Sequence, residues 1–98
     1  MFLIIIISII PIGINLNLSE TTTEEIENIH NIISNNVKKY RLEANFTQME
    51  LSLLMGYKNS AFIGACENNA NNKHFNIEQL YKISKILNIP LSKLVEIN

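Results

Sequence analysis

The chain has 98 residues, 47% of them hydrophobic and 17% charged, so it can build one small core but not two independent domains. Three glycines and two prolines argue against a loop-rich sheet protein, and the single cysteine, Cys66, excludes an internal disulfide framework. Cys66 with His30 and His74 makes a poor metal-ligand set, and common nucleotide-binding, metalloprotease and esterase motifs are missing. We therefore expect no metal, no cofactor and no enzymatic activity.

Charge is unevenly distributed along the chain. Residues 1–37 carry four acids and no base, whereas residues 38–98 carry eight bases and five acids, which gives this part a net charge of +3. A basic region that follows an acidic leader is compatible with nucleic-acid binding.

The first 20 residues form an apolar leader, which we separate from a domain at residues 21–98. Residues 2–10 read Phe-Leu-Ile-Ile-Ile-Ile-Ser-Ile-Ile and are followed by Pro11. Four interpretations stay open: an N-terminal strand or arm that pairs in a dimer, a leader outside the true domain, a secretory signal, or a membrane anchor. The stretch is too short to span a bilayer alone, no basic residue precedes it and no small-residue cleavage site follows. We therefore expect a cytoplasmic protein that does not contact the membrane.

Residues 23–44 are predicted to form an amphipathic helix. The run of threonines at 21–23 followed by Glu24 and Glu25 has capping-box spacing. One apolar stripe then follows at helical spacing; its members are Ile26, Ile29, Ile33, Val37 and Tyr40. Asn45 is expected to end the helix in the left-handed conformation.

Two short helices are predicted next, at 47–55 and 60–67. The run 47–50, Thr-Gln-Met-Glu, is a second capping box, and Phe46 is placed as its hydrophobic staple. The first helix stops at Gly56, and Ile63 and Cys66 supply the apolar positions of the second. Two short helices joined by a tight turn are typical of a helix-turn-helix.

Helices at 77–87 and 91–96 complete an all-α fold of five helices. Asn76 is placed as the cap of the fourth helix, Asn88 ends it, and Pro90 opens the last one, while 68–72 forms a polar turn. The expected core residues are Val37, Phe46, Leu51, Met55, Ile63, Cys66, Leu80, Ile83, Leu87 and Leu94.

Residues 32–97 resemble the Cro / phage-repressor-like (Xre family) helix-turn-helix domain. The ordered features that carry the resemblance are Arg41, Phe46-Thr47-Gln48, Leu51-Ser52, Met55-Gly56, Ile63, Cys66-Glu67, Leu80, Ile83, Leu87 and the run 89–94, Ile-Pro-Leu-Ser-Lys-Leu. The chain departs from the family where Ser52 replaces the usual Ala and Asn69 the usual Gly. The spacing from Gly56 to Glu67 is one residue longer than usual, and the loop 68–76 is also longer.

The resemblance implies a repressor-like bundle that binds double-stranded DNA. In this family the first helix of the motif anchors on the DNA backbone and the second enters the major groove. The candidate DNA-binding residues are Gln48, Lys58, Asn59, Ser60, Ala61, Gly64, Ala65, Asn71, Asn72 and Lys73. The small Gly64 and Ala65 fit either a close approach to the groove floor or close helix packing. Arg41 and Glu67 are expected to form a structural ion pair that ties two helices together.

We expect a sequence-specific transcriptional regulator, in the manner of a repressor, that acts as a homodimer. The alternative is a protein-interaction module, such as an antitoxin that grips a partner through its apolar N-terminal segment. A third option is a membrane-tethered regulator. Leu53 and Leu54 stand where the family has polar residues, so either they extend a surface for a partner or the long first helix covers them.

Overall fold

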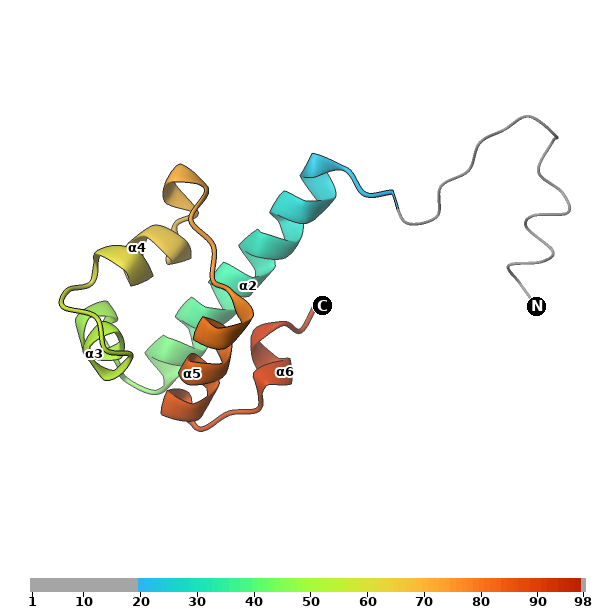
Figure 1. The fold of residues 1–98 in the computed structure, drawn as a ribbon. Helices are drawn as coiled ribbons and strands as arrows, with labels where there is room; N and C mark the ends of the chain where they lie inside the picture. The colour runs from blue at the N-terminus through green and yellow to red at the C-terminus, as the bar shows by residue number, and fades with distance from the viewer. Residues whose placement is uncertain (1–19, 98) are drawn as a thin grey trace, which may run out of the picture.

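The computed structural model describes residues 20–97, and the described part of the chain is all-α (Figure 1). Its elements in chain order are α2 (Thr23–Glu43), α3 (Gln48–Leu54), α4 (Ala61–Glu67), the 3-10 turn η1 (Ala70–Asn72), α5 (Ile77–Leu87) and α6 (Leu91–Leu94). The five predicted helices are confirmed with boundaries shifted by at most two residues. The four interpretations of the leader fall on residues 1–19 and so lie outside the described residues.

Three of these helices begin with a complete capping box. In each box the side chain of the N-cap residue accepts a hydrogen bond from the backbone three residues on, and the side chain there accepts one from the N-cap backbone. The pairs are Thr22 with Glu25, Thr47 with Glu50, and Asn76 with Gln79. These local bonds satisfy backbone donors that a helix start leaves unpaired, so the chain itself specifies where the helices begin.

Asparagine takes the place of glycine at several turns. Asn45 follows α2 with a φ of 62°, Asn69 follows α4 at 51° and Asn88 caps α5 at 56°, all in the left-handed region. Asparagine tolerates this conformation better than other non-glycine residues because its short polar side chain bonds locally. The expected helix ends at Asn45 and Asn88 are thus confirmed.

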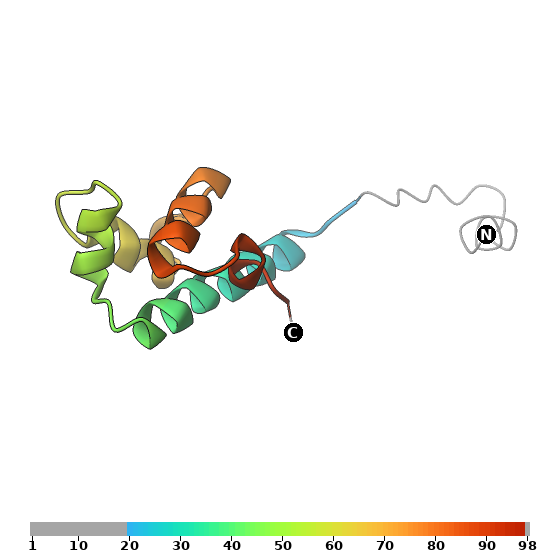
Figure 2. The ribbon, with the colours of Figure 1, turned by 90° about the horizontal axis from the view of Figure 1, so that it is seen from below.

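The core lies where α2 packs against α4, α5 and α6, and α3 adds Leu51 to it from its contacts with α4 and α5 (Figure 2). Nine of the ten predicted core residues are buried, and Phe75 joins them. The exception is Phe46, which packs against the edge of the core and is only partly buried. Phe75 comes from the irregular segment before α5, where no helical spacing marks it as a core residue.

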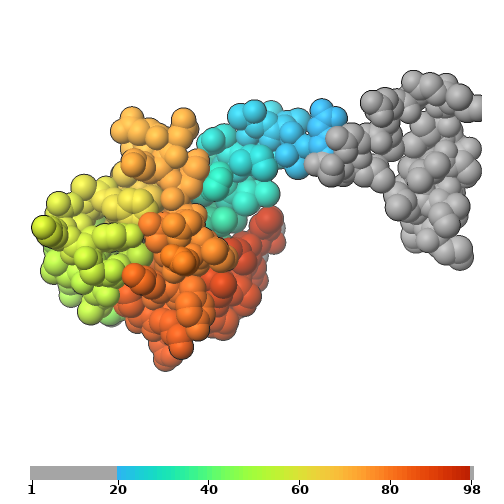
Figure 3. All heavy atoms as spheres, viewed as in Figure 1, coloured from blue at the N-terminus to red at the C-terminus, as the bar shows by residue number. Residues whose placement is uncertain are grey.

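The first turns of α2 project beyond the rest of the described residues (Figure 3). The apolar stripe of α2 is therefore buried at Val37 but exposed at Ile26 and Ile29, where 42% and 40% of each residue is accessible. Among residues 20–97, no helix is both long and apolar enough to cross a membrane.

Candidate nucleic-acid interface

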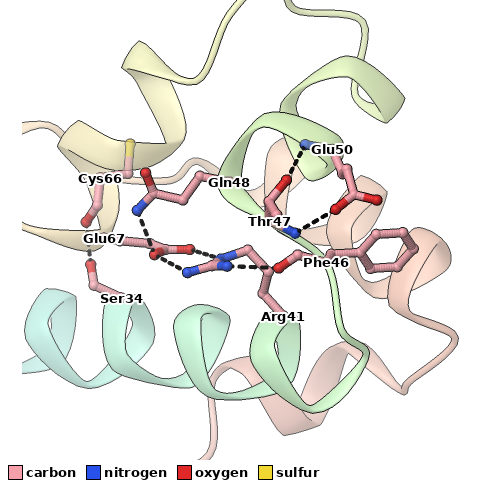
Figure 4. Close-up of polar contacts among 8 residues, drawn as sticks. All are labelled: Ser34, Arg41, Phe46, Thr47, Gln48, Glu50, Cys66 and Glu67. Carbon is pink, nitrogen blue, oxygen red and sulfur yellow. Dashed lines mark hydrogen bonds and ion pairs between the residues drawn. The ribbon is translucent and has the colours of Figure 1, made fainter.

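A buried ion pair connects α2 to the end of α4. Arg41 Nε donates to Glu67 Oε2 at 2.7 Å and Arg41 Nη2 donates to Glu67 Oε1 at 3.0 Å, which is bidentate geometry (Figure 4). Arg41 Nη1 also donates to the Phe46 carbonyl oxygen at 2.7 Å, just before α3 begins. One guanidinium group therefore sets the position of α4 and the entry of α3 together.

Gln48, the first residue of α3, completes this connection. Its Nε2 donates to Glu67 Oε1 at 3.0 Å, so the amide that we predicted to meet a phosphate has a partner within the chain. A Cβ at Gly64 would lie 3.2 Å from Gln48 Oε1, tighter than ordinary van der Waals contact. Gly64 therefore permits close packing of α3 on α4. Of the two interpretations of its small size, this observation favours close helix packing over a close approach to the DNA groove.

An aromatic cluster supports the turn between the two short helices. The rings of Tyr57 and Phe62 are 5.2 Å apart at their centroids, and Phe62 meets Phe75 edge to face at 6.0 Å. Gln79 on α5 donates to the Tyr57 hydroxyl at 3.0 Å. These contacts hold the turn against the core.

The start of α4 is exposed and carries polar side chains. Lys58 and Asn59 are exposed and Ser60 is half-buried. Ser60 occupies the N-cap position without a side-chain cap bond, and Asn59 Oδ1 instead accepts from the Ala61 backbone N–H at 2.9 Å. Asn59 therefore helps to begin α4, a second task beside the base contact predicted for it.

The outward face of α4 consists mainly of small side chains. Ala61 is exposed and Ala65 is half-buried. Gly64 is also half-buried, but its Cβ position faces Gln48 on α3. Asn68, which the sequence analysis placed only in a polar turn, is exposed one helical turn beyond Ala65 on the same face. Its spacing of seven residues from Ala61 is the signal that could have identified it as a surface candidate.

The loop after α4 is attached to α2 through Asn69. The Ser34 hydroxyl donates to the Cys66 carbonyl oxygen at 2.7 Å and lies 3.1 Å from Asn69 Oδ1, and Asn69 Nδ2 donates to Asn31 Oδ1. The three remaining DNA-binding candidates of this loop are exposed beyond that anchor; they are Asn71, Asn72 and Lys73. The 3-10 turn η1, which contains Asn71 and Asn72, contacts α4.

Two histidines stack where this loop returns to α2. The rings of His30 and His74 lie 3.6 Å apart and are nearly parallel, at 7°. His74 Nε2 is 3.9 Å from Glu27 Oε1, and His74 Nδ1 is buried without a hydrogen-bond partner among the described residues. Desolvation, followed by the neighbouring His74, lowers the pKa of His30, and Glu27 partly opposes this.

Cys66 is a packing residue in this arrangement. It is fully buried, and burial raises the pKa of its thiol to about 11. A thiol with such a pKa carries almost no thiolate near neutral pH, so it is a poor nucleophile. No group of three or more metal-ligating side chains that could hold an ion occurs within residues 20–97.

The exposed leucines of α3 are not covered by α2. Leu53 is 55% and Leu54 57% accessible in the described structure. The interpretation in which the long first helix covers them is therefore wrong. α2 contacts α4, α5 and α6, while α3 packs mainly on α4 and α5.

No protein-family model matches this chain, and no curated protein sequence matches it either. Its fold is similar to a crystal structure of the hypothetical transcription factor NHTF from Neisseria, with a TM-score of 0.62. The two chains are 18% identical, and the similarity covers 84% of this chain and 90% of the other. At this identity the similarity establishes a shared fold.

Proposed function

We propose that this protein is a sequence-specific DNA-binding regulator of transcription that represses by occupying its site. The observation that carries the proposal is the pairing of α3 with α4 through Gln48 and Glu67, which Arg41 ties to α2, together with the exposed start of α4. The shared fold with a protein named as a hypothetical transcription factor supports the same conclusion. This role requires neither catalysis nor a cofactor, and it is exercised in the cytoplasm.

In this proposal, the residues at the edges of the α3–α4 pair contact the DNA phosphates. Exposed Lys58 and Lys73 lie before and after α4 and supply positive charge on its two sides. Gln48 uses one amide hydrogen for Glu67, and a primary amide has two, so the second is left for a phosphate oxygen. These contacts would position the protein without reading sequence.

In this proposal, residues at the start and on the outward face of α4 contact the bases. The Asn59 side-chain oxygen caps the helix, which leaves its amide nitrogen to donate to a base edge. Ser60 and Asn68 offer further polar groups at the two ends of the helix. Between them, the exposed Ala61 has a methyl group that can contact a thymine methyl.

A homodimer makes this weakly charged domain an effective binder. Residues 38–98 have a net charge of only +3, so a single copy gains little from the electrostatic attraction that dominates non-specific binding. Two copies related by a two-fold axis double the phosphate contacts. They would place two α4 helices in successive major grooves, about 34 Å apart.

Selection from random duplex DNA with the full chain tests this proposal. We expect an enriched site with two related halves, and an affinity for it that falls steeply as salt is raised. The double variant of Lys58 and Lys73 to Ala should lose most of this affinity. The matched double variant of Lys82 and Lys85 to Ala, two exposed lysines on α5, should keep it. If no duplex is enriched and binding does not respond to salt, the proposal is wrong.

A protein-interaction module is the second candidate function. The exposure of Leu53 and Leu54 favours it, since adjacent apolar side chains on a surface helix are common at protein interfaces. This candidate predicts a stable complex with a second protein, lost on changing both leucines to Ser, together with no affinity for duplex DNA.

A further inference from the structure

The projecting start of α2 carries an apolar stripe that the described residues leave open. Ile26, Ile29 and Ile33 lie on the same helix face as Val37, which is fully buried. The stripe thus begins on the part of α2 that Figure 3 shows beyond the other helices, and it continues along the helix into the core. A helix face of this kind normally packs on another element.

The end of the chain extends this surface. Asn36 Nδ2 donates to the carbonyl oxygens of Leu94 and Glu96 at 3.1 and 3.0 Å, which holds the segment after α6 beside α2. In that segment Val95 is 39% and Ile97 61% accessible. Two exposed apolar residues therefore belong to the segment that Asn36 holds beside α2.

We infer that residues 2–14 of the same chain dock along this stripe. This segment is uncharged and carries ten Phe, Leu or Ile side chains that need cover. It is joined to the N-cap Thr22 by the seven residues 15–21, which can span about 23–25 Å. The stripe from Thr22 to Ile29 is only about 10 Å long, so the tether allows the segment to fold back along the helix.

A second copy of the chain fits this surface less well for two reasons. A stable dimer buries about 800 Å² per partner, far more than isoleucines that are 42% and 40% accessible can supply on a two-turn stripe. Symmetric pairing would also bring together two helix starts that each carry Glu24, Glu25 and Glu27 with no base before Lys38. A tethered segment avoids this repulsion and binds at a high effective concentration. The inference does not depend on the proposed function.

Paramagnetic broadening in the full chain tests the inference. A nitroxide attached at Ser8→Cys marks the leader, and the buried Cys66 should stay unlabelled, which the unsubstituted chain treated in the same way verifies. We expect loss of intensity for the methyl signals of Ile26 and Ile29, unchanged on dilution. The methyl signals of Leu53 and Leu54, which are more exposed than Ile26 and Ile29 but lie on α3, should keep their intensity.

Three further samples make the outcome decisive. Changing Ile26 and Ile29 to Ser should abolish the label's effect on the remaining methyl signals of this surface, such as Val95 and Ile97, whereas changing Leu53 and Leu54 to Ser should leave it intact. Mixing isotope-labelled chains without nitroxide with nitroxide-labelled chains should produce no broadening. Broadening in that mixture would assign the stripe to a second copy and overturn the inference. Absent broadening, or broadening equal at all exposed methyl groups, would overturn it as well.

Discussion

Glu67 is the residue on which the helix pairing depends. Its carboxylate accepts two hydrogen bonds from Arg41 and one from Gln48, and its side chain is only 1% accessible. A carboxylate in this position offsets the cost of burying the guanidinium, and losing either partner leaves a buried charge without compensation.

The change Glu67→Ala should therefore lower the free energy of unfolding by about 3 kcal/mol. The exposed Glu43→Ala, at the end of α2, should change it little. Urea denaturation of the two variants measures the difference. Equal losses would show that the ion pair contributes nothing to stability.

Ser52 presents the opposite situation, since its hydroxyl is buried with no hydrogen-bond partner in the described structure. Ser52→Ala should leave stability unchanged or raise it by about 1 kcal/mol, because it removes a polar group that has lost its hydration. Ser84→Ala is the matched control, because this buried serine donates a hydrogen bond to the Tyr81 carbonyl oxygen at 2.6 Å. The Ser84→Ala variant should therefore be less stable than the Ser52→Ala variant. The same loss in both variants, measured by thermal melting, would contradict this account.

At the scale of elements, the stacked histidines join the loop before α5 to α2. The lowered pKa of His30 means that the unfolded chain binds the proton more readily than the folded one. The folded state is then fully favoured above the ordinary value of 6.5 and loses stability as the pH falls from there towards the lowered pKa.

Melting temperatures at about pH 7.5 and about pH 5 test this linkage. The fall between them should be larger for the natural chain than for His30→Gln, which cannot be protonated. Carboxylates titrate in both proteins and so cancel in the comparison. If the melting temperature falls by the same amount in both proteins, the histidine stack does not contribute to the pH dependence of stability.

In the proposed DNA-binding role, Lys58 contacts phosphate and Asn59 contacts a base, so variants of these two residues should differ in kind. Lys58→Ala should weaken binding to all duplexes alike and reduce the salt slope by about one. Asn59→Ser keeps an oxygen that can cap α4 but removes the amide donor. It should cost about 1–3 kcal/mol at the selected site and little on random DNA. Titration of both variants against both duplexes measures this.

Serine is the better substitution because Asn59→Ala would also remove the cap bond to Ala61 and so affect folding. If Lys58→Ala and Asn59→Ser lose affinity equally on selected and random DNA, the proposed recognition surface is misplaced. If neither changes binding, the DNA-binding proposal itself fails.

At the scale of the whole molecule, a two-fold dimer implies a fixed distance between the halves of its site. Inserting about five base pairs between the halves turns one of them to the opposite side of the duplex. We expect this insertion to abolish the tight complex of two chains, while an insertion of about ten restores part of it. Analytical ultracentrifugation with each duplex counts the bound chains. Equal affinity for all three duplexes would exclude the two-fold arrangement.

Local signals in the sequence predicted most of the fold because they act between near neighbours. The threonine caps of α2 and α3 bond to glutamates three residues away, and Asn45 and Asn88 enter the left-handed region by their own conformational preference. The resemblance of the ordered motif added the partnership of Arg41 and Glu67, which no local rule contains.

The sequence by itself therefore determined the helices, their ends and nearly all of the core. Only the tertiary structure decided that Phe75 is buried, that Ile26 and Ile29 are exposed, and that Gln48 bonds to Glu67 across Gly64. Helical periodicity tells which residues share a face, but it does not tell how far a neighbouring element extends along that face. The length of α2 beyond its partners, and contacts between residues far apart in the chain, are set by how the helices pack.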